Sequence, residues 1–141
     1  MAVAAGLSLE RATSPKVREM ASHTNRELSL MLAGAKPFAA FVLDGVLTEE
    51  QALSDQPFQR YVDAGRIVRR EVPVVLSGLP MCRLLFALPG EEWRFDKYCA
   101  LMESMSDGWN EDKERQEGAL LGYTDEENDA HIERLRARWK P

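Results

Sequence analysis

The sequence has little of what would assign a function directly. It contains only two cysteines, Cys82 and Cys99, and two cysteines in 141 residues do not make a disulfide framework. No apolar run approaches the ~18 residues that a membrane-spanning helix needs. The first residues, Met-Ala-Val-Ala-Ala-Gly-Leu, lack the positive region and the sustained apolar core of a secretory signal. We therefore expect free thiols and a cytoplasmic location.

Basic residues are also scarce relative to acidic ones. The chain has 18 Lys and Arg against 23 Asp and Glu, which gives a net charge of -5 and a pI near 5.1. Binding to nucleic acid or to an anionic membrane surface requires clustered basic side chains. We therefore expect neither of these partners. An acidic surface can, however, steer association with a basic protein.

The composition that is present is that of a globular protein. Hydrophobic residues make up 45% of the chain and charged residues 29%, and both fractions are ordinary for a folded domain. A chain of this length forms one domain by the usual size range. We expect a single domain over residues 1–141, with residues 1–13 as a flexible arm.

The first half of the chain alternates between helical and extended patterns. Ser14 followed by Pro15 is a typical helix start, and Gly34 is a typical end. Residues 38–43 are apolar throughout, as in a covered strand. A further helix is predicted over residues 48–64, and Pro57 is expected to divide it.

The second half begins with the clearest strand pair. Residues 66–76 and 81–88 read as two strands joined by a four-residue connection, Ser-Gly-Leu-Pro. Pro73 lacks an amide donor, which indicates that the first of these strands lies at a sheet edge or carries a bulge there. Residues 93–95 are predicted to form a short third strand. Everything from Asp96 onward has helical spacing.

Together these elements predict an α+β fold. We expect a small antiparallel sheet of three or four strands, with an N-terminal helix, an inserted helix and a C-terminal helical third. The first helix and the C-terminal helices are expected to cover one face of the sheet. Trp93 is expected in the core and Trp139 on the surface, while the sequence leaves Trp109 open.

One segment has the outline of a catalytic motif. Residues 41–48, Phe-Val-Leu-Asp-Gly-Val-Leu-Thr, resemble motif one of haloacid-dehalogenase-like phosphatases, in which an apolar strand ends in Asp-x-Asp-Gly. The resemblance places the acid/base on Asp44 and the nucleophile on Val42, and a loose second match places a serine role on Ser77. Valine can neither attack phosphorus nor bind Mg²⁺. The pattern instead indicates a strand that ends in an Asp-Gly turn, followed by a helix capped by Thr48.

The remaining polar residues do not predict a cofactor or a metal site. His131 follows Glu127 by four residues, so the two side chains share a helical face and could supply two metal ligands. No third ligand is identifiable. Residues 117–124 and the helix after them also have the outline of a helix-turn-helix, but acids at the start of the second helix would repel DNA.

Our leading hypothesis is a non-enzymatic protein-binding module of inhibitor, immunity, antitoxin or adaptor type. Residues 111–133 hold nine acidic residues, and their helical surface would contact a basic protein partner. The candidate contact residues are Glu117, Asp125, Glu126, Asp129 and Trp109. The sequence does not indicate an oligomeric state, and we assign no catalytic residue.

The alternative is a small-molecule or anion-binding domain, or a small enzyme, with a cleft near Asp44, Ser77 and Arg70. Alternation would place Arg66 on the same strand face as Arg70, and arginine suits carboxylates and phosphates. This hypothesis requires that Asp44, Ser77 and an arginine converge in a concave pocket. A flat surface turn at Asp44 would count against it.

Overall fold

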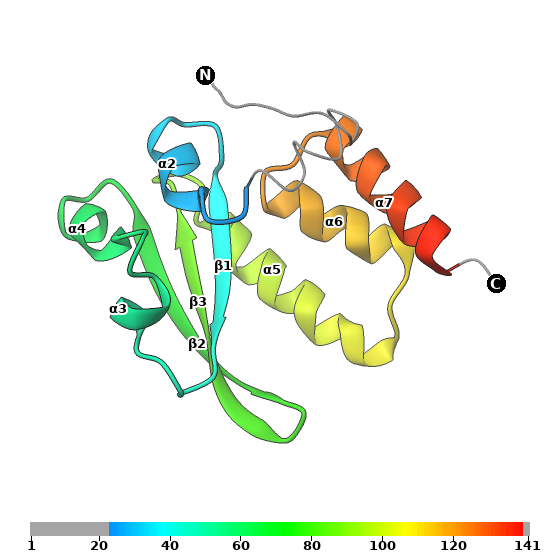
Figure 1. Cartoon of the computed structure of the whole chain (residues 1–141), viewed down its shortest axis with the longest axis horizontal. Coiled ribbons are helices and arrows are strands. Elements are labelled where there is room, and N and C mark those ends of the chain that lie inside the picture. Colours follow the sequence, from blue (N-terminus) through cyan, green and yellow to red (C-terminus); the bar gives the residue numbers. More distant parts are fainter. Residues whose placement is uncertain (1–22, 140–141) are drawn as a thin grey trace.

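The computed structural model describes residues 23–139 (Figure 1). Its helices and three-stranded antiparallel sheet confirm the predicted α+β class. The predicted arm and the predicted helix start at Ser14 lie outside these residues. In chain order the elements are α2 (Glu27–Leu32), β1 (Phe38–Leu43), α3 (Glu49–Ala52), α4 (Phe58–Asp63), β2 (Val68–Leu76), β3 (Leu79–Ala87), α5 (Trp93–Ser104), the 3-10 helix η1 (Met105–Asp107), α6 (Glu111–Leu120) and α7 (Asp125–Trp139).

The sheet has the strand order β1-β3-β2, so β3 is central. Leu76 pairs with Leu79 across a two-residue turn, Ser77-Gly78, whose φ angles are 53° and 77°. Two positive φ angles define the tight hairpin turn whose twist matches that of the strands. The predicted four-residue connection is therefore wrong, because Leu79 and Pro80 already belong to β3.

Pro73 lies where a missing amide costs no hydrogen bond. The Leu76–Leu79 pair that closes the hairpin exchanges backbone hydrogen bonds, and in an antiparallel ladder bonded and non-bonded pairs alternate. Pro73 pairs with Cys82 at a non-bonded position, so its nitrogen points away from β3. The strand order confirms the prediction that this strand lies at an edge.

Helices cover both faces of the sheet. Alternation along β3 sends Leu84 and Phe86 towards α2 and α4, and Leu85 and Ala87 towards α5 and α6. Figure 1 shows α2, α3 and α4 on one side of the strands and α5, α6 and α7 on the other. The prediction that the first helix and the C-terminal helices share one face is therefore wrong. The two buried clusters are Leu28, Met31, Ala39, Phe58, Ile67, Leu84 and Phe86 on the first face, and Phe38, Leu85, Ala87, Phe95, Tyr98, Leu101 and Leu120 on the second.

Helix α5 begins earlier than the sequence indicated. The predicted third strand over residues 93–95 is wrong, because these residues form the first turn of α5. Phe95 shares a buried helical stripe with Tyr98 and Leu101, and this stripe packs on the sheet. Trp93 lies off the stripe and is 50% exposed, so its predicted place in the core is also wrong. Trp109 is 51% exposed.

The predicted ends of the early helices are largely confirmed. Asn25 has a φ of 64°, so no continuous helix runs through it to Gly34. The end itself is as predicted: the Gly34 amide donates to the Met31 carbonyl, and the Ala35 amide donates to the Leu30 carbonyl. This pattern is the Schellman motif that glycine favours. The predicted division at Pro57 is confirmed by the separate helices α3 and α4.

Helices α6 and α7 approach each other closely at a glycine. Gly118 is buried in α6, and the side chain of Asn128 from α7 lies directly against it. The Asn128 amide donates to the Arg115 carbonyl at 3.2 Å. Gly118 therefore serves the packing of the two helices, which offsets its poor helix propensity.

We predict that Gly118→Ala destabilises the protein. The added methyl group would lie 1.8 Å from Oδ1 of Asn128, so this side chain would have to leave its position. We expect the free energy of unfolding, measured by urea denaturation, to fall by about 1–3 kcal/mol. In an Asn128→Ala background the obstacle is gone, and Gly118→Ala is expected to stabilise by up to ~1 kcal/mol. A more stable Gly118→Ala protein in the wild-type background would contradict this packing.

Candidate functional site

The predicted acidic surface on α6 and α7 is crossed by ion pairs. Arg136 binds both carboxylate oxygens of Glu111, at 2.5 and 2.7 Å. Asp129, one of the candidate contact residues, accepts from Arg115 at 2.5 Å. The negative charge that the sequence places here is therefore partly neutralised by bases on the facing helix.

The other candidates on this surface differ in exposure. Trp109 is exposed, and its indole N–H donates to Glu114 at 2.8 Å. Burial, together with the charge of Glu114, raises the pKa of the Glu117 carboxyl above its usual range. Asp125 and Glu126 are exposed in the first turn of α7. The five predicted residues thus form no continuous free acidic patch.

The residues of the alternative ligand site do not come together. Asp44 lies in an exposed turn, where its carboxylate accepts from the Val46 amide at 2.9 Å. Ser77 lies at the tip of the β2–β3 hairpin. It is seven residues from Arg70 along β2, and this spacing corresponds to roughly 23 Å in a strand.

The two arginines of that site are engaged elsewhere. Arg70 pairs with Asp96 at 2.8 Å and lies over the ring of Phe95. Arg66 lies over the ring of Tyr61, 5.6 Å from its centroid. The geometry therefore gives no support to a cleft formed by Asp44, Ser77 and these arginines.

A buried lysine forms a polar cluster that the sequence did not reveal. Lys36 is only 2% exposed; its ammonium group lies 3.0 Å from Nδ1 of His23 and also donates to the carbonyl of Leu121. The His23 ring stacks on Tyr123 at 3.9 Å. Burial lowers the pKa of Lys36 to about 8. The cluster joins the segment before β1 to the end of α6, so its evident role is structural.

The outer edge of β1 is unpaired within the part of the chain that the structure describes. The Leu88 amide donates to the Pro37 carbonyl at 3.0 Å, which fixes the phase of the β1–β3 ladder. Because bonded pairs alternate, Ala39, Phe41 and Leu43 bond to β3, and Ala40 and Val42 point away from it. Within residues 23–139 no backbone hydrogen bond meets these outward groups.

The surroundings of this edge are apolar and exposed. Val42 is 46% exposed, and Val46 and Leu47, in the loop that follows, are exposed too. Folded proteins usually protect a free edge with proline, with charged residues or with a bulge. The segment from Ala40 to Leu43 contains none of these devices.

The opposite edge of the sheet is protected. The backbone of β2 turns Arg69, Glu71 and Pro73 outward, by the same alternation that places Pro73. Arg69 pairs with Glu71 at 2.6 Å and with Glu49 at 2.5 Å, so charged side chains lie along this edge. Among the residues that the structure describes, the β1 edge is left unpaired and unprotected, whereas the β2 edge is protected.

Comparisons with known proteins do not indicate a function: no family model, no curated protein and no solved structure matches the chain.

In the described part of the chain, no group of three or more His, Cys, Asp or Glu side chains could hold a metal ion. No helix there is long and apolar enough to cross a membrane. Cys82 and Cys99 are free thiols, each half-buried.

We predict that His23 makes stability depend on pH. Burial, with a contribution from the Lys36 charge, lowers the pKa of its imidazole from 6.5 to about 3. Between these values the unfolded chain binds a proton that the folded chain does not, so stability falls as the pH decreases. We expect this residue to contribute a loss of at most about 3 kcal/mol between roughly pH 7 and pH 4.

The measurement is urea denaturation at a series of pH values. His23→Phe keeps a ring for stacking on Tyr123 but cannot titrate. Carboxylates also titrate at low pH, but they are present in both proteins. The difference between the free energies of unfolding of wild type and variant therefore reports the contribution of the His23 imidazole. If both proteins lose stability equally between these pH values, the claim that the buried His23 imidazole stays neutral in the folded protein is wrong.

Proposed function

We propose that the protein is a non-enzymatic protein-binding module that pairs β1 with an extended segment of its partner. The observation that carries this proposal is the contrast between the two edges of the sheet. The outward backbone groups of Ala40 and Val42 are unpaired within the described residues, whereas β2 carries Pro73 and charged residues at its edge. Strand addition to an exposed edge is a recurrent mode of peptide recognition.

The side chains near the edge indicate the chemistry of the partner. Val42, Val46 and Leu47 offer apolar contacts to alternate side chains of an added strand. Asp44 follows β1 directly, is exposed and has no ion pair within residues 23–139. An apolar strand flanked by a basic residue would complement this surface.

This function is of the class that the sequence favoured, with a different contact surface. The ion pairs across α6 and α7 reduce the charge available on the acidic helices, whereas the β1 edge offers both hydrogen bonds and apolar area. A cytoplasmic inhibitor, immunity protein, antitoxin or adaptor could bind in this way. The free thiols support a reducing compartment such as the cytoplasm.

The test is a proline substitution at the open edge. Val42→Pro removes an amide that points away from β3, so the β1–β3 ladder is kept while strand addition is blocked. Random peptides displayed on phage would be selected on the wild-type protein, and their affinities measured by titration calorimetry. We expect Val42→Pro to weaken binding of the selected peptides at least tenfold, since one backbone donor is lost and the proline ring obstructs the added strand.

The matched control is Val75→Pro, which makes the same change at an outward position of β2. Val75 is 71% exposed, so the control tests for a general effect of proline in an exposed strand. We expect its affinity for the same peptides to stay within about twofold of wild type. Equal binding by Val42→Pro and wild type would overturn the proposed edge. Circular dichroism checks that both variants are folded.

A further inference from the structure

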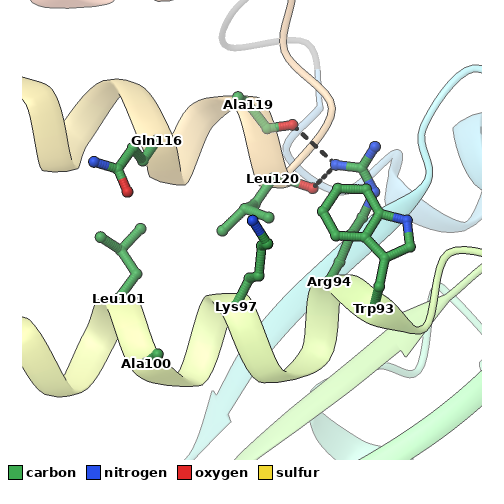
Figure 2. A pocket seen from close by; sticks show the side chains of 8 residues that line it. All are labelled: Trp93, Arg94, Lys97, Ala100, Leu101, Gln116, Ala119 and Leu120. Carbon is green, nitrogen blue, oxygen red and sulfur yellow. Dashed lines mark hydrogen bonds between the residues drawn. The ribbon is translucent and has the colours of Figure 1, made fainter.

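A second surface, separate from the β1 edge, lies between α5 and α6. Figure 2 shows the two helices side by side with a groove between them, whose volume is about 630 Å³. This volume is in the range of small-molecule sites. The groove is lined by Trp93, Arg94, Lys97, Ala100, Leu101, Gln116, Ala119 and Leu120.

Arg94 already has hydrogen-bond partners within the protein. Its Nε donates to Glu91 at 2.9 Å, and its Nη1 donates to the carbonyls of Ala119 and Leu120 at 3.1 and 3.0 Å (Figure 2). These carbonyls belong to the last turn of α6. The Ala119 carbonyl also accepts from the Gly122 amide at 3.1 Å. Arg94 therefore links α5 to the end of α6 and is not available to a ligand.

Lys97 is the available cation. In Figure 2 its side chain extends from α5 towards α6, into the space that the groove occupies. It has no ion pair or hydrogen bond within the described residues, and its ammonium group lies 5.9 Å from the ring centroid of Trp93. Its positive charge is therefore free to pair with an anionic group of a ligand.

The other residues that line the groove are suited to contact a flat, apolar part of a ligand. The Trp93 indole is half exposed, and the guanidinium of Arg94 lies 4.5 Å from its ring centroid, which restricts its motion. Leu101 and Ala100 supply the apolar floor, and Figure 2 shows Gln116 on α6 facing Leu101. An exposed indole beside aliphatic side chains favours contact with an aromatic ring.

We propose that the α5–α6 groove binds a small aromatic anion, such as an aryl carboxylate or sulfonate. The anionic group pairs with Lys97, and the aromatic ring packs on Trp93 and Leu101. The side-chain NH₂ of Gln116 already donates to Asp112 at 2.8 Å, so its carbonyl oxygen, which faces Leu101, accepts from a polar substituent. This site is independent of the β1 edge, since it lies between two helices that cover one face of the sheet and includes no residue of β1.

The test uses 1-anilinonaphthalene-8-sulfonate, which combines aromatic rings with a sulfonate and fluoresces when bound. We expect one saturable site in a fluorescence titration of the full chain. Lys97→Met is expected to weaken binding about tenfold, since a charge-assisted contact is lost, and Lys97→Arg to restore most of it. 2-Naphthoate should compete for the site, whereas uncharged 2-naphthol should compete at least tenfold more weakly.

A pair of tryptophan variants tests the ring contact. Trp93→Leu is expected to weaken binding at least fivefold. Trp109→Leu changes an equally exposed tryptophan outside the groove and should stay within twofold of wild type. If neither Lys97→Met nor Trp93→Leu changes the affinity, the dye binds elsewhere and the proposed site is wrong. Unchanged thermal unfolding of each variant shows that any loss is local.

Discussion

The structure depends on the burial of strand β3 on both of its faces. Leu84, Leu85, Phe86 and Ala87 are consecutive and each is fully buried. Because side chains alternate along a strand, this run requires an apolar layer on each side of the sheet. The helices before the β2–β3 hairpin supply one layer, and the helices after it supply the other.

This constraint also produces the two free edges. A central strand needs a neighbour on each side, and a three-stranded sheet then leaves two outer strands. In β2 the edge is closed by Pro73 and by ion pairs, so pairing there is disfavoured. In β1 the outward groups of Ala40 and Val42 have no backbone partner among residues 23–139. The proposed binding edge therefore includes Val42, which also lies in the segment that resembles a phosphatase motif. The proposal rests on the backbone groups of this segment, not on its side chains.

Some local signals in the sequence predicted local features correctly, although the four-residue hairpin connection and the strand over residues 93–95 were wrong. The absent amide of Pro73 indicated an edge strand, and Gly34 indicated a helix end. Features set by long-range packing were missed: the exposure of Trp93 depends on which stripe of α5 meets the sheet. Lys36 reads as an ordinary surface lysine until the fold brings it to the carbonyl of Leu121, 85 residues away. The α5–α6 groove was not predicted from the sequence either, because it forms only when two separate helices pack together.

The open edge of β1 is tested most directly by amide hydrogen exchange, followed by NMR on the free protein. The amides of Ala39, Phe41 and Leu43 donate to β3 and are expected to exchange slowly, near the rate of global unfolding. The amides of Ala40 and Val42 alternate with them, point away from β3 and are expected to exchange much faster. Protection of Ala40 and Val42 equal to that of their neighbours would show that another segment already occupies the edge, and would contradict the account.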